Sequence, residues 1–530
     1  MTNAARAVHP ILFSLYIVLA LIANNLGEVH FGQALRSLVV LPVATCALAL
    51  LLRQAVGSAH AAASIASLIL LGTWLHGGAR TIAQRFLTHR FGGDVFPYLL
   101  FVELVVVSTA TALILRYGRE TPRLTRTLNF MAAGLLVFPL LQITLRVARG
   151  DNPIRSSAQG AESLGPAVVL QPRTSAPRDI YYILVDGYAG ADVLQTFYGL
   201  DNSAFLDKLR SMGFFVAAQS RTNYLSTKLV LPSVLNFEFL DDLVDQVGRQ
   251  SKDVRPLVAS LQRNRVVSAL RAAGYRIVDI SSGVDYVALA DSDESIVRHG
   301  SWTRLNEFES VLLEMTPVPE LLEHMSTNTS EAAAHRRRVE YAIEALASQG
   351  TRPGPKFVFA HIFSPHDPFV FGRQSEERPL RLLLFNDYST QQYQMLIRAY
   401  RDQVVYLNGL LLRALNRVLT ESPNAPIVIL QGDHGLRLYL KRFVRSTCLV
   451  ESVSILNAFH LPGERPSAIG DSISPVNTFR VIFDSYFGTD LGLLEDRVYF
   501  SHRYGIYDFI DVTKTAGTCH TRSSIPDPPP

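Results

Sequence analysis

The segment from residue 427 to residue 435 has the pattern with the most specific chemistry. Its sequence is Ile-Val-Ile-Leu-Gln-Gly-Asp-His-Gly, so an apolar run leads into Asp433 and His434. Four apolar, mostly β-branched residues predict a buried strand. A carboxylate next to an imidazole, with a glycine on each side, suits a divalent metal ion. The same pair can also close an ordinary turn, so the interpretation depends on other segments that end in this way.

Three other segments also carry polar side chains where a predicted strand ends. They span residues 180–188, 275–283 and 356–367. From residue 179 onward such strands alternate with helical patterns, which predicts a parallel α/β sheet. Ligands of open α/β sheets bind beyond the carboxyl ends of the strands. We therefore expect Asp186, Asp433 and His434 to meet in one cleft and to bind one divalent metal ion, which could be manganese, magnesium, zinc or calcium.

A candidate nucleophile lies in the segment from residue 221 to residue 236. Thr227 and Lys228 stand there, ahead of a helix predicted to run through residues 232–240. A threonine hydroxyl has a high pKa, and contact with the metal ion would activate it, so we expect Thr227 to be both a metal ligand and the nucleophile. Lys228 adds positive charge for a substrate. The alternative is that Thr227 only caps the helix; the two roles are compatible, because a helix amino terminus also favours an anion.

The first 150 residues have a different composition from the rest. They contain five apolar stretches, each near the length that crosses ~30 Å of hydrocarbon. These stretches cover residues 11–27, 37–52, 61–77, 95–115 and 128–145. The densest short basic loop, residues 116–126, is predicted to be cytoplasmic by the positive-inside rule, which places everything after the fifth span outside. Glu103 lies in the fourth span, where we expect a protonated or water-contacted carboxylate near the end of the span; the alternative is a contact with a lipid headgroup or another helix.

Composition shifts divide the chain into four parts. Gly, Pro and Ser without periodicity mark a linker and a disordered tail. The parts are a transmembrane domain at 1–149, a linker at 150–178, a catalytic domain at 179–514 and a tail at 515–530. The net charge of +4 is small for 530 residues and does not indicate nucleic-acid binding. Cys448 and Cys519 could pair in an oxidising compartment or remain two free thiols.

Taken in order, these motifs resemble the alkaline phosphatase superfamily in its sulfatase-like branch, and the whole chain resembles the membrane-anchored lipoteichoic acid synthase type. The resemblance rests on residues 185–187, 223–236, 361–369, 431–435, 473–480 and 486–488. It implies an α/β fold, an alkaline-phosphatase-like doubly wound sheet sandwich preceded by a five-helix transmembrane domain. It also assigns Asp186, Thr227, Asp433 and His434 to one metal ion.

The resemblance further implies roles for residues near the substrate. His366 is expected near the phosphate or the leaving group, as a catalytic residue. His361 is a candidate for substrate binding, with a hydrogen-bonded strand-end residue as its alternative. Arg437 could hold anionic oxygens, whereas Lys441 is expected to be solvated surface charge.

The chain departs from the patterns of the families that it resembles at three places. Lipoteichoic acid synthases use Glu where this chain has Asp186. The Cys/Ser-x-Pro-x-Arg motif of sulfatases does not occur around Thr227. The Asp-x-x-x-His pair of two-metal phosphatases is also missing between the nucleophile segment and Asp433, which favours a single metal ion.

These observations lead to one main hypothesis and two alternatives. The main hypothesis is a multi-pass cell-membrane enzyme whose extracytoplasmic domain is a metal-dependent phosphotransferase or phosphodiesterase. Its partners would be the lipid bilayer and, as substrates, phospholipid headgroups or envelope glycans. The first alternative is a sulfatase-like ester hydrolase that uses water. The second is a non-catalytic module that binds an envelope polymer.

Overall fold

The computed structural model describes residues 6–25, 31–91, 95–117, 122–148, 168–173, 177–297, 305–325, 331–372, 382, 388–463, 466–502 and 505–519. Contacts separate the chain into two units. We call residues 1–156 with 301–331 the helical unit, and residues 157–300 with 332–530 the sheet unit.

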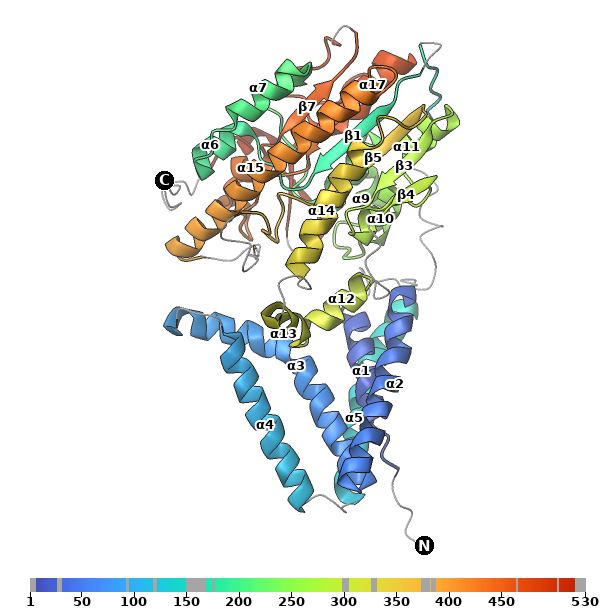
Figure 1. Ribbon diagram of the computed structural model, residues 1–530. Helices are drawn as coiled ribbons and strands as arrows, with labels where there is room; N and C mark the ends of the chain where they lie inside the picture. The colour runs from blue at the N-terminus through green and yellow to red at the C-terminus, as the bar shows by residue number, and fades with distance from the viewer. Residues whose placement is uncertain are drawn as a thin grey trace. The chain divides into compact units, whose positions relative to one another are not determined.

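The helical unit contains five apolar helices (Figure 1). They are α1 (His9–Asn24), α2 (Phe31–Val56), α3 (Ala59–Phe91), α4 (Phe96–Tyr117) and α5 (Pro122–Ala148). Four of them, α2 to α5, are long and apolar enough to cross a membrane, whereas α1 has 16 residues. The five predicted apolar stretches therefore fall on five helices, and the chain is a membrane protein.

Two short helices from the middle of the chain also belong to the helical unit. They are α12 (Glu307–Glu314) and α13 (Val318–Met325). The sequence-based division placed them in the domain at 179–514, and the structure differs there. The reason is apolar packing: the Phe308 side chain is buried among Val18, Ile22 and Ala34 of α1 and α2.

A seven-stranded mixed sheet forms the centre of the sheet unit, with strand order β2-β7-β6-β1-β5-β3-β4. The strands are β1 (Ile180–Val185), β2 (Phe214–Val216), β3 (Arg276–Ile280), β4 (Glu294–Ile296), β5 (Lys356–Ile362), β6 (Ile427–Gly432) and β7 (Asn457–His460). Strands β1, β3, β4, β5 and β6 pair in parallel, as predicted. Strand β7 is antiparallel to both β6 and β2, so the sheet is not purely parallel. Between β6 and β7 lie the 3-10 helix η3 (Val444–Ser446) and the five-residue helix α16 (Leu449–Val453), and neither is long enough to form the helical crossover usual for a parallel pair.

Helices cover both faces of this sheet, as the prediction of a doubly wound sandwich requires. Along β1, Tyr181, Ile183 and Val185 enter one apolar core, while Ile180, Tyr182 and Leu184 enter the other. The first core is completed by α6 (Ala191–Tyr198), α7 (Ser203–Ser211), α14 (Glu331–Ala347) and α15 (Thr390–Glu421), which lie in front of the sheet in Figure 1. The second core is completed by α8 (Thr227–Asn236), α9 (Asp241–Val247), α10 (Arg255–Gln262), α11 (Arg265–Ala272) and α17 (Thr478–Phe487).

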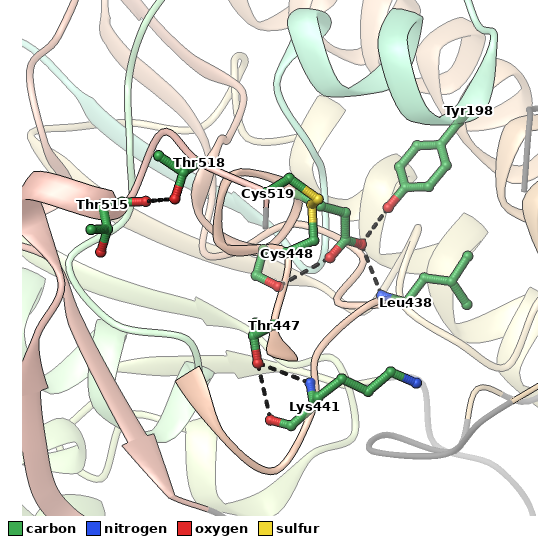
Figure 2. The surroundings of a disulfide bond; sticks show 10 residues. Tyr198, Leu438, Lys441, Thr447, Cys448, Thr515, Thr518 and Cys519 are labelled. Atoms are coloured by element: carbon green, nitrogen blue, oxygen red, sulfur yellow. Dashed lines mark hydrogen bonds between the residues drawn. A yellow bond between two sulfur atoms is a disulfide. The ribbon is translucent and has the colours of Figure 1, made fainter. Parts of the chain in front are cut away.

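The end of the described chain is tied to the sheet unit. A hairpin of β8 (Tyr499–His502) and β9 (Gly505–Asp511) precedes a disulfide bond between Cys448 and Cys519, shown beside Tyr198 and Leu438 in Figure 2. Residues 515–519, which the sequence analysis assigned to a disordered tail, are therefore ordered, and residues 520–530 lie outside the described part. The end of the predicted linker also packs on this unit, because Leu170 is buried in the second core.

Candidate metal centre

Parallel strands bring the predicted site residues to one edge of the sheet. Val185, the last residue of β1, lies opposite the last residues of β5 and β6. The side chains that follow these strands therefore leave the sheet at the same level. Asp186, Asp433 and His434 are buried, and each offers one ligand atom in a group whose atoms lie within 4.8 Å of one another. We call these three residues the metal group.

Backbone amides fix the carboxylate of Asp433. Its Oδ1 accepts hydrogen bonds from the amides of Gly187 (3.0 Å) and His434 (2.9 Å). Its Oδ2 accepts a hydrogen bond of 2.6 Å from the Thr227 hydroxyl. Glycine is required at position 435, because a Cβ there would lie 2.0 Å from the carbonyl oxygen of Glu451. The glycine after the Asp–His pair thus allows the close packing that holds this corner.

The imidazole of His434 turns one nitrogen toward both carboxylates. Its Nδ1 donates to the carbonyl of Gly435 (2.8 Å), which leaves the lone pair on Nε2. Nε2 lies 3.2 Å from Asp433 Oδ2 and 3.6 Å from Asp186 Oδ1. Burial, and next the charge of Arg437, lowers the pKa of His434 to about 4, so the ring is neutral near pH 7. A neutral imidazole lone pair facing two carboxylate oxygens is the donor arrangement that a divalent cation needs.

Asp186 presents one oxygen to the protein and one to the metal group. Its Oδ2 accepts a hydrogen bond of 3.2 Å from His361 Nε2, whereas its buried Oδ1 has no hydrogen-bond partner. Burial raises the pKa of Asp186, but His366 and His361 outweigh burial and bring it below the usual range. A buried, ionised and unpartnered oxygen is costly, and a bound cation would remove that cost. The residues present therefore fit a divalent metal ion.

Thr227 is the first residue of α8 and faces the metal group. Its Oγ1 lies 2.6 Å from Asp433 Oδ2 and 3.4 Å from His434 Nε2. The capping position belongs to Ser226, whose side chain makes no capping hydrogen bond. The alternative that Thr227 is only a helix cap is therefore wrong. Helix α8 starts earlier than predicted and ends at Asn236, and it directs its amino terminus to the site.

His366 and Arg437 contact each other beside the metal group. Arg437 Nη2 donates to His366 Nε2 (3.2 Å), and His366 Nδ1 donates to the carbonyl of Asp367 (2.7 Å). Burial lowers the pKa of His366, but the carboxylates of Asp186 and Asp367 outweigh it and the net shift is upward. The backbone amide of His366 also donates to the carbonyl of Asp186 (2.9 Å), which ties the two segments together.

Arg437 is held in an unusual backbone conformation. Its φ of +63° lies in the left-handed region, which costs free energy for a residue with a side chain. One arm of the guanidinium donates to the carbonyl of Leu225 (2.9 Å), while its buried Nε has no hydrogen-bond partner. A buried donor of this kind is available for an anionic oxygen.

Three other predicted residues are engaged within the protein. Both ring nitrogens of His361 are used, one by Asp186 and the other by the Ser282 hydroxyl (2.8 Å), so the structure favours the strand-end alternative for this histidine. The ammonium of Lys228 lies over the Tyr286 ring at 4.9 Å. The ammonium of Lys441 lies 3.4 Å from the Tyr393 hydroxyl.

Two residues that support the site were not identified from sequence. Ser282 lies in a strand-end segment whose small polar residues were noted, but its contact with His361 could not be predicted. Glu451 is fully buried and accepts hydrogen bonds from the Tyr198 hydroxyl and the amide of Leu438 (2.8 Å), and burial raises its pKa. It holds the loop that presents Arg437, and nothing in the local sequence marks it.

Comparisons with known proteins give matches among solved structures alone. No family model and no curated protein matches the chain. The C-terminal periplasmic domain of EcEptC from Escherichia coli, in complex with Zn, is similar at 12% identity, with a TM-score of 0.45 over 67% of this chain and 97% of that chain. The lipooligosaccharide phosphoethanolamine transferase A (EptA) from Neisseria meningitidis gives 12% identity and a TM-score of 0.36 over 86% and 87%. A protein in the alkaline phosphatase superfamily from Vibrio parahaemolyticus gives 12% identity and a TM-score of 0.37 over 65% and 80%.

Proposed function

We propose that this chain is a membrane-anchored, metal-dependent phosphotransferase or phosphodiesterase with Thr227 as its nucleophile. One observation carries the proposal: the Thr227 hydroxyl lies 2.6 Å from Asp433 Oδ2, inside a buried group with an unpartnered Asp186 oxygen. Asp186, Asp433, His434 and Thr227 would hold one divalent cation. When bound, such a cation lowers the pKa of a hydroxyl and offsets the charge of phosphoryl oxygens.

The protein's own residues supply the remaining parts of the reaction. Thr227 would react as the alkoxide, with its proton lost to solvent water, because Asp433 Oδ2, which accepts its hydrogen bond here, would be a ligand of the cation. The Thr227 oxygen attacks phosphorus, the bond from phosphorus to the leaving alcohol breaks, and a phosphothreonine ester remains. Protonated His366, which its raised pKa favours, gives the Nε2 proton to the departing alkoxide, and the neutral ring then accepts the Arg437 hydrogen bond as in the structure. In the second step neutral His366 takes the proton of a second alcohol or of water as that oxygen attacks phosphorus, the bond from phosphorus to the Thr227 oxygen breaks, and Thr227 is again the alkoxide.

Two features hold the phosphoryl oxygens. Helix α8 begins at Thr227, and the positive end of its dipole favours an anion there. The buried Nε of Arg437 has no hydrogen-bond partner and can donate to an anionic oxygen. Because a guanidinium keeps its charge at any physiological pH, this contact would not depend on protonation.

The helices and the disulfide support a location for the sheet unit outside the cytoplasm. Disulfide bonds persist in oxidising compartments, so the bond between Cys448 and Cys519 supports an extracytoplasmic sheet unit in a multi-pass membrane protein. The basic loop at 116–126 supports the same orientation. An active site on the extracytoplasmic side of the bilayer suits phospholipid headgroups or envelope glycans as substrates, and ATP is scarce in that compartment.

The test uses the full chain in lipid nanodiscs with a divalent metal ion and bis(p-nitrophenyl) phosphate, with p-nitrophenyl sulfate beside it. We expect turnover of the phosphodiester and a nitrophenylphosphate adduct on Thr227 in a mass spectrum. Thr227→Ala should lower kcat/KM by about a thousandfold or more, whereas Ser226→Ala, the neighbouring hydroxyl, should keep activity. Preferred turnover of the sulfate ester would indicate a sulfatase-like hydrolase, and full activity of Thr227→Ala would remove this residue from the mechanism.

A further inference from the structure

Residues 305–325 return from the sheet unit to the membrane helices. The chain leaves the helical unit after α5, forms the first strands of the sheet unit, and then contributes α12 and α13 to the helical unit. Phe308 anchors this return, because its side chain is 2% exposed and packs among the ends of α1 and α2. Leu312 and Met315, four and seven residues later on the same side of α12, pack against the same cluster.

The contacts fix the level at which this segment lies along the bundle. Asn306 Nδ2 donates to the carbonyl of Gln33 (2.8 Å), near the start of α2, and Glu309 forms an ion pair with Arg36. The buried cluster around Phe308 also includes Ile22 near the end of α1 and, packed against it, Ile143 near the end of α5. The segment therefore lies at the end of the bundle from which the chain leaves α5 for the sheet unit.

Polar groups join α13 to two of the long helices. Glu320 accepts from Arg80 Nη1 (2.9 Å), and its other oxygen lies 2.9 Å from His76 Nε2 on α3. On its opposite side, His76 Nδ1 lies 2.9 Å from Glu103 Oε2 of α4, so the buried ring bridges two carboxylates. We call His76, Arg80, Glu103 and Glu320 the membrane cluster. The main polar side of α13 thus points into the helical unit.

The other side of α13 is apolar and exposed. Val318, Leu321 and Leu322 are 40%, 42% and 42% exposed, and their spacing of three and four residues puts them on one face. A helix on the surface of a soluble domain has the opposite arrangement, with its apolar face inward and its charges outward. An apolar outer face over a charged inner face is expected where the surroundings are hydrocarbon rather than water.

The apolar surface continues onto the neighbouring span. Leu75 and Ile82, which flank the histidine and arginine of the membrane cluster on α3, are 58% and 62% exposed. The amide of Gly77, between them, donates to the carbonyl of Met315 (2.9 Å), so the turn between α12 and α13 rests directly on this surface. The exposed face of α13 is therefore continuous with a face of the bundle that lipid must cover.

We propose that residues 305–325 form an interfacial membrane element, with Val318, Leu321 and Leu322 in contact with lipid acyl chains of the leaflet at the end of the bundle where α1 and α5 end. The sheet unit is then joined to the membrane at three connections: after α5, before α12 and after α13. Additional connections limit how far the metal group can move from the bilayer, which raises the effective concentration of lipid around it. This element does not depend on the proposed chemistry.

The experiment uses the full chain with Cys46→Ser, which removes the free thiol and keeps the disulfide. Leu321→Cys carries an environment-sensitive fluorophore in phosphatidylcholine vesicles that contain lipid with a nitroxide near the headgroup. Leu493→Cys, at a 50% exposed leucine of the sheet unit, is the matched control. We expect lipid nitroxide to quench the Leu321 label about threefold or more above the control, and aqueous iodide to quench it less.

Two results would overturn the proposal. In the first, iodide reaches the Leu321 label as readily as the control label, which would place the helix in water. Alternatively, neither quencher reaches it, which would place the helix against protein. Val318→Cys repeats the measurement one turn away on the same face, so poor folding of one variant leaves the proposal testable.

Discussion

The metal group and the membrane cluster contain the same ingredients in different arrangements. Each has one buried imidazole between two carboxylates. In the membrane cluster the two nitrogens of His76 face different carboxylates, each at 2.9 Å. In the metal group a single nitrogen, Nε2 of His434, faces both carboxylates at 3.2 and 3.6 Å, while Nδ1 bonds a carbonyl.

This difference separates a cluster that holds helices together from a cluster that can bind a metal ion. A ring that bridges two acids has each nitrogen paired, so the membrane cluster ties three helices together. Converging donors leave a common point between them, and the metal group also leaves Asp186 Oδ1 without a hydrogen-bond partner. Residue types alone therefore do not identify a metal site; the direction of the lone pairs does.

The largest expected difference between the two clusters is in activity. Asp186→Asn removes a charge that the cation would neutralise, so we expect metal binding to fail and kcat/KM to fall by about a thousandfold or more. Glu103→Gln makes the same isosteric change in the membrane cluster and should keep kcat/KM per folded molecule. Turnover of the phosphodiester and bound metal per protein are measured for both. Equal losses in the two variants would contradict the distinction.

For the free energy of unfolding, we expect the larger loss in the membrane cluster rather than in the metal group. His76→Ala removes the partner of Glu103 and leaves Glu320 with Arg80, and breaking a buried pair costs about 3–5 kcal/mol. Because Glu103 and Glu320 keep 21% and 17% of their side-chain exposure, we expect roughly 2–3 kcal/mol instead. Thermal unfolding of the full chain in nanodiscs measures the loss, with His502→Ala, a half-buried histidine of the sheet unit, as control. An unchanged Tm for His76→Ala would mean that the membrane cluster does not stabilise the helical unit.

The central part of the site was accessible from sequence because it depends on local pattern. The apolar runs of β1, β5 and β6 are long, and polar residues follow each of them at its carboxyl end. Parallel strands in register then bring Asp186, Asp433 and His434 together whatever the remaining fold. The position of Thr227 followed from the motif order rather than from its helix, whose start was placed too late.

Contacts between distant segments were not accessible in this way. Glu103 contacts His76 of α3, which is the helix contact named as the alternative for this residue, and hydropathy cannot select that pairing among the polar residues of the spans. The return of α12 and α13 to the helical unit was missed because an eight-residue amphipathic pattern is the same in a helix of the sheet unit and in a helix that packs on membrane spans. That α13 has its charged side inward and its apolar side outward is known only from the contacts of Glu320 with α3.

The smallest expected effect concerns a support of the metal group. The Ser282 hydroxyl donates to His361 Nδ1, which fixes the ring with its Nε2 proton toward Asp186 Oδ2. This arrangement leaves Asp186 Oδ1 for the cation, so Ser282→Ala should weaken metal affinity about 10- to 100-fold, the usual effect of losing such a support. Titration calorimetry with the metal ion measures it, and Ser281→Ala is the neighbouring control. Because the membrane cluster has no such converging oxygen, no comparable substitution around His76 should change metal affinity; a similar loss in Ser281→Ala would mean that the whole loop, and not this hydrogen bond, supports the site.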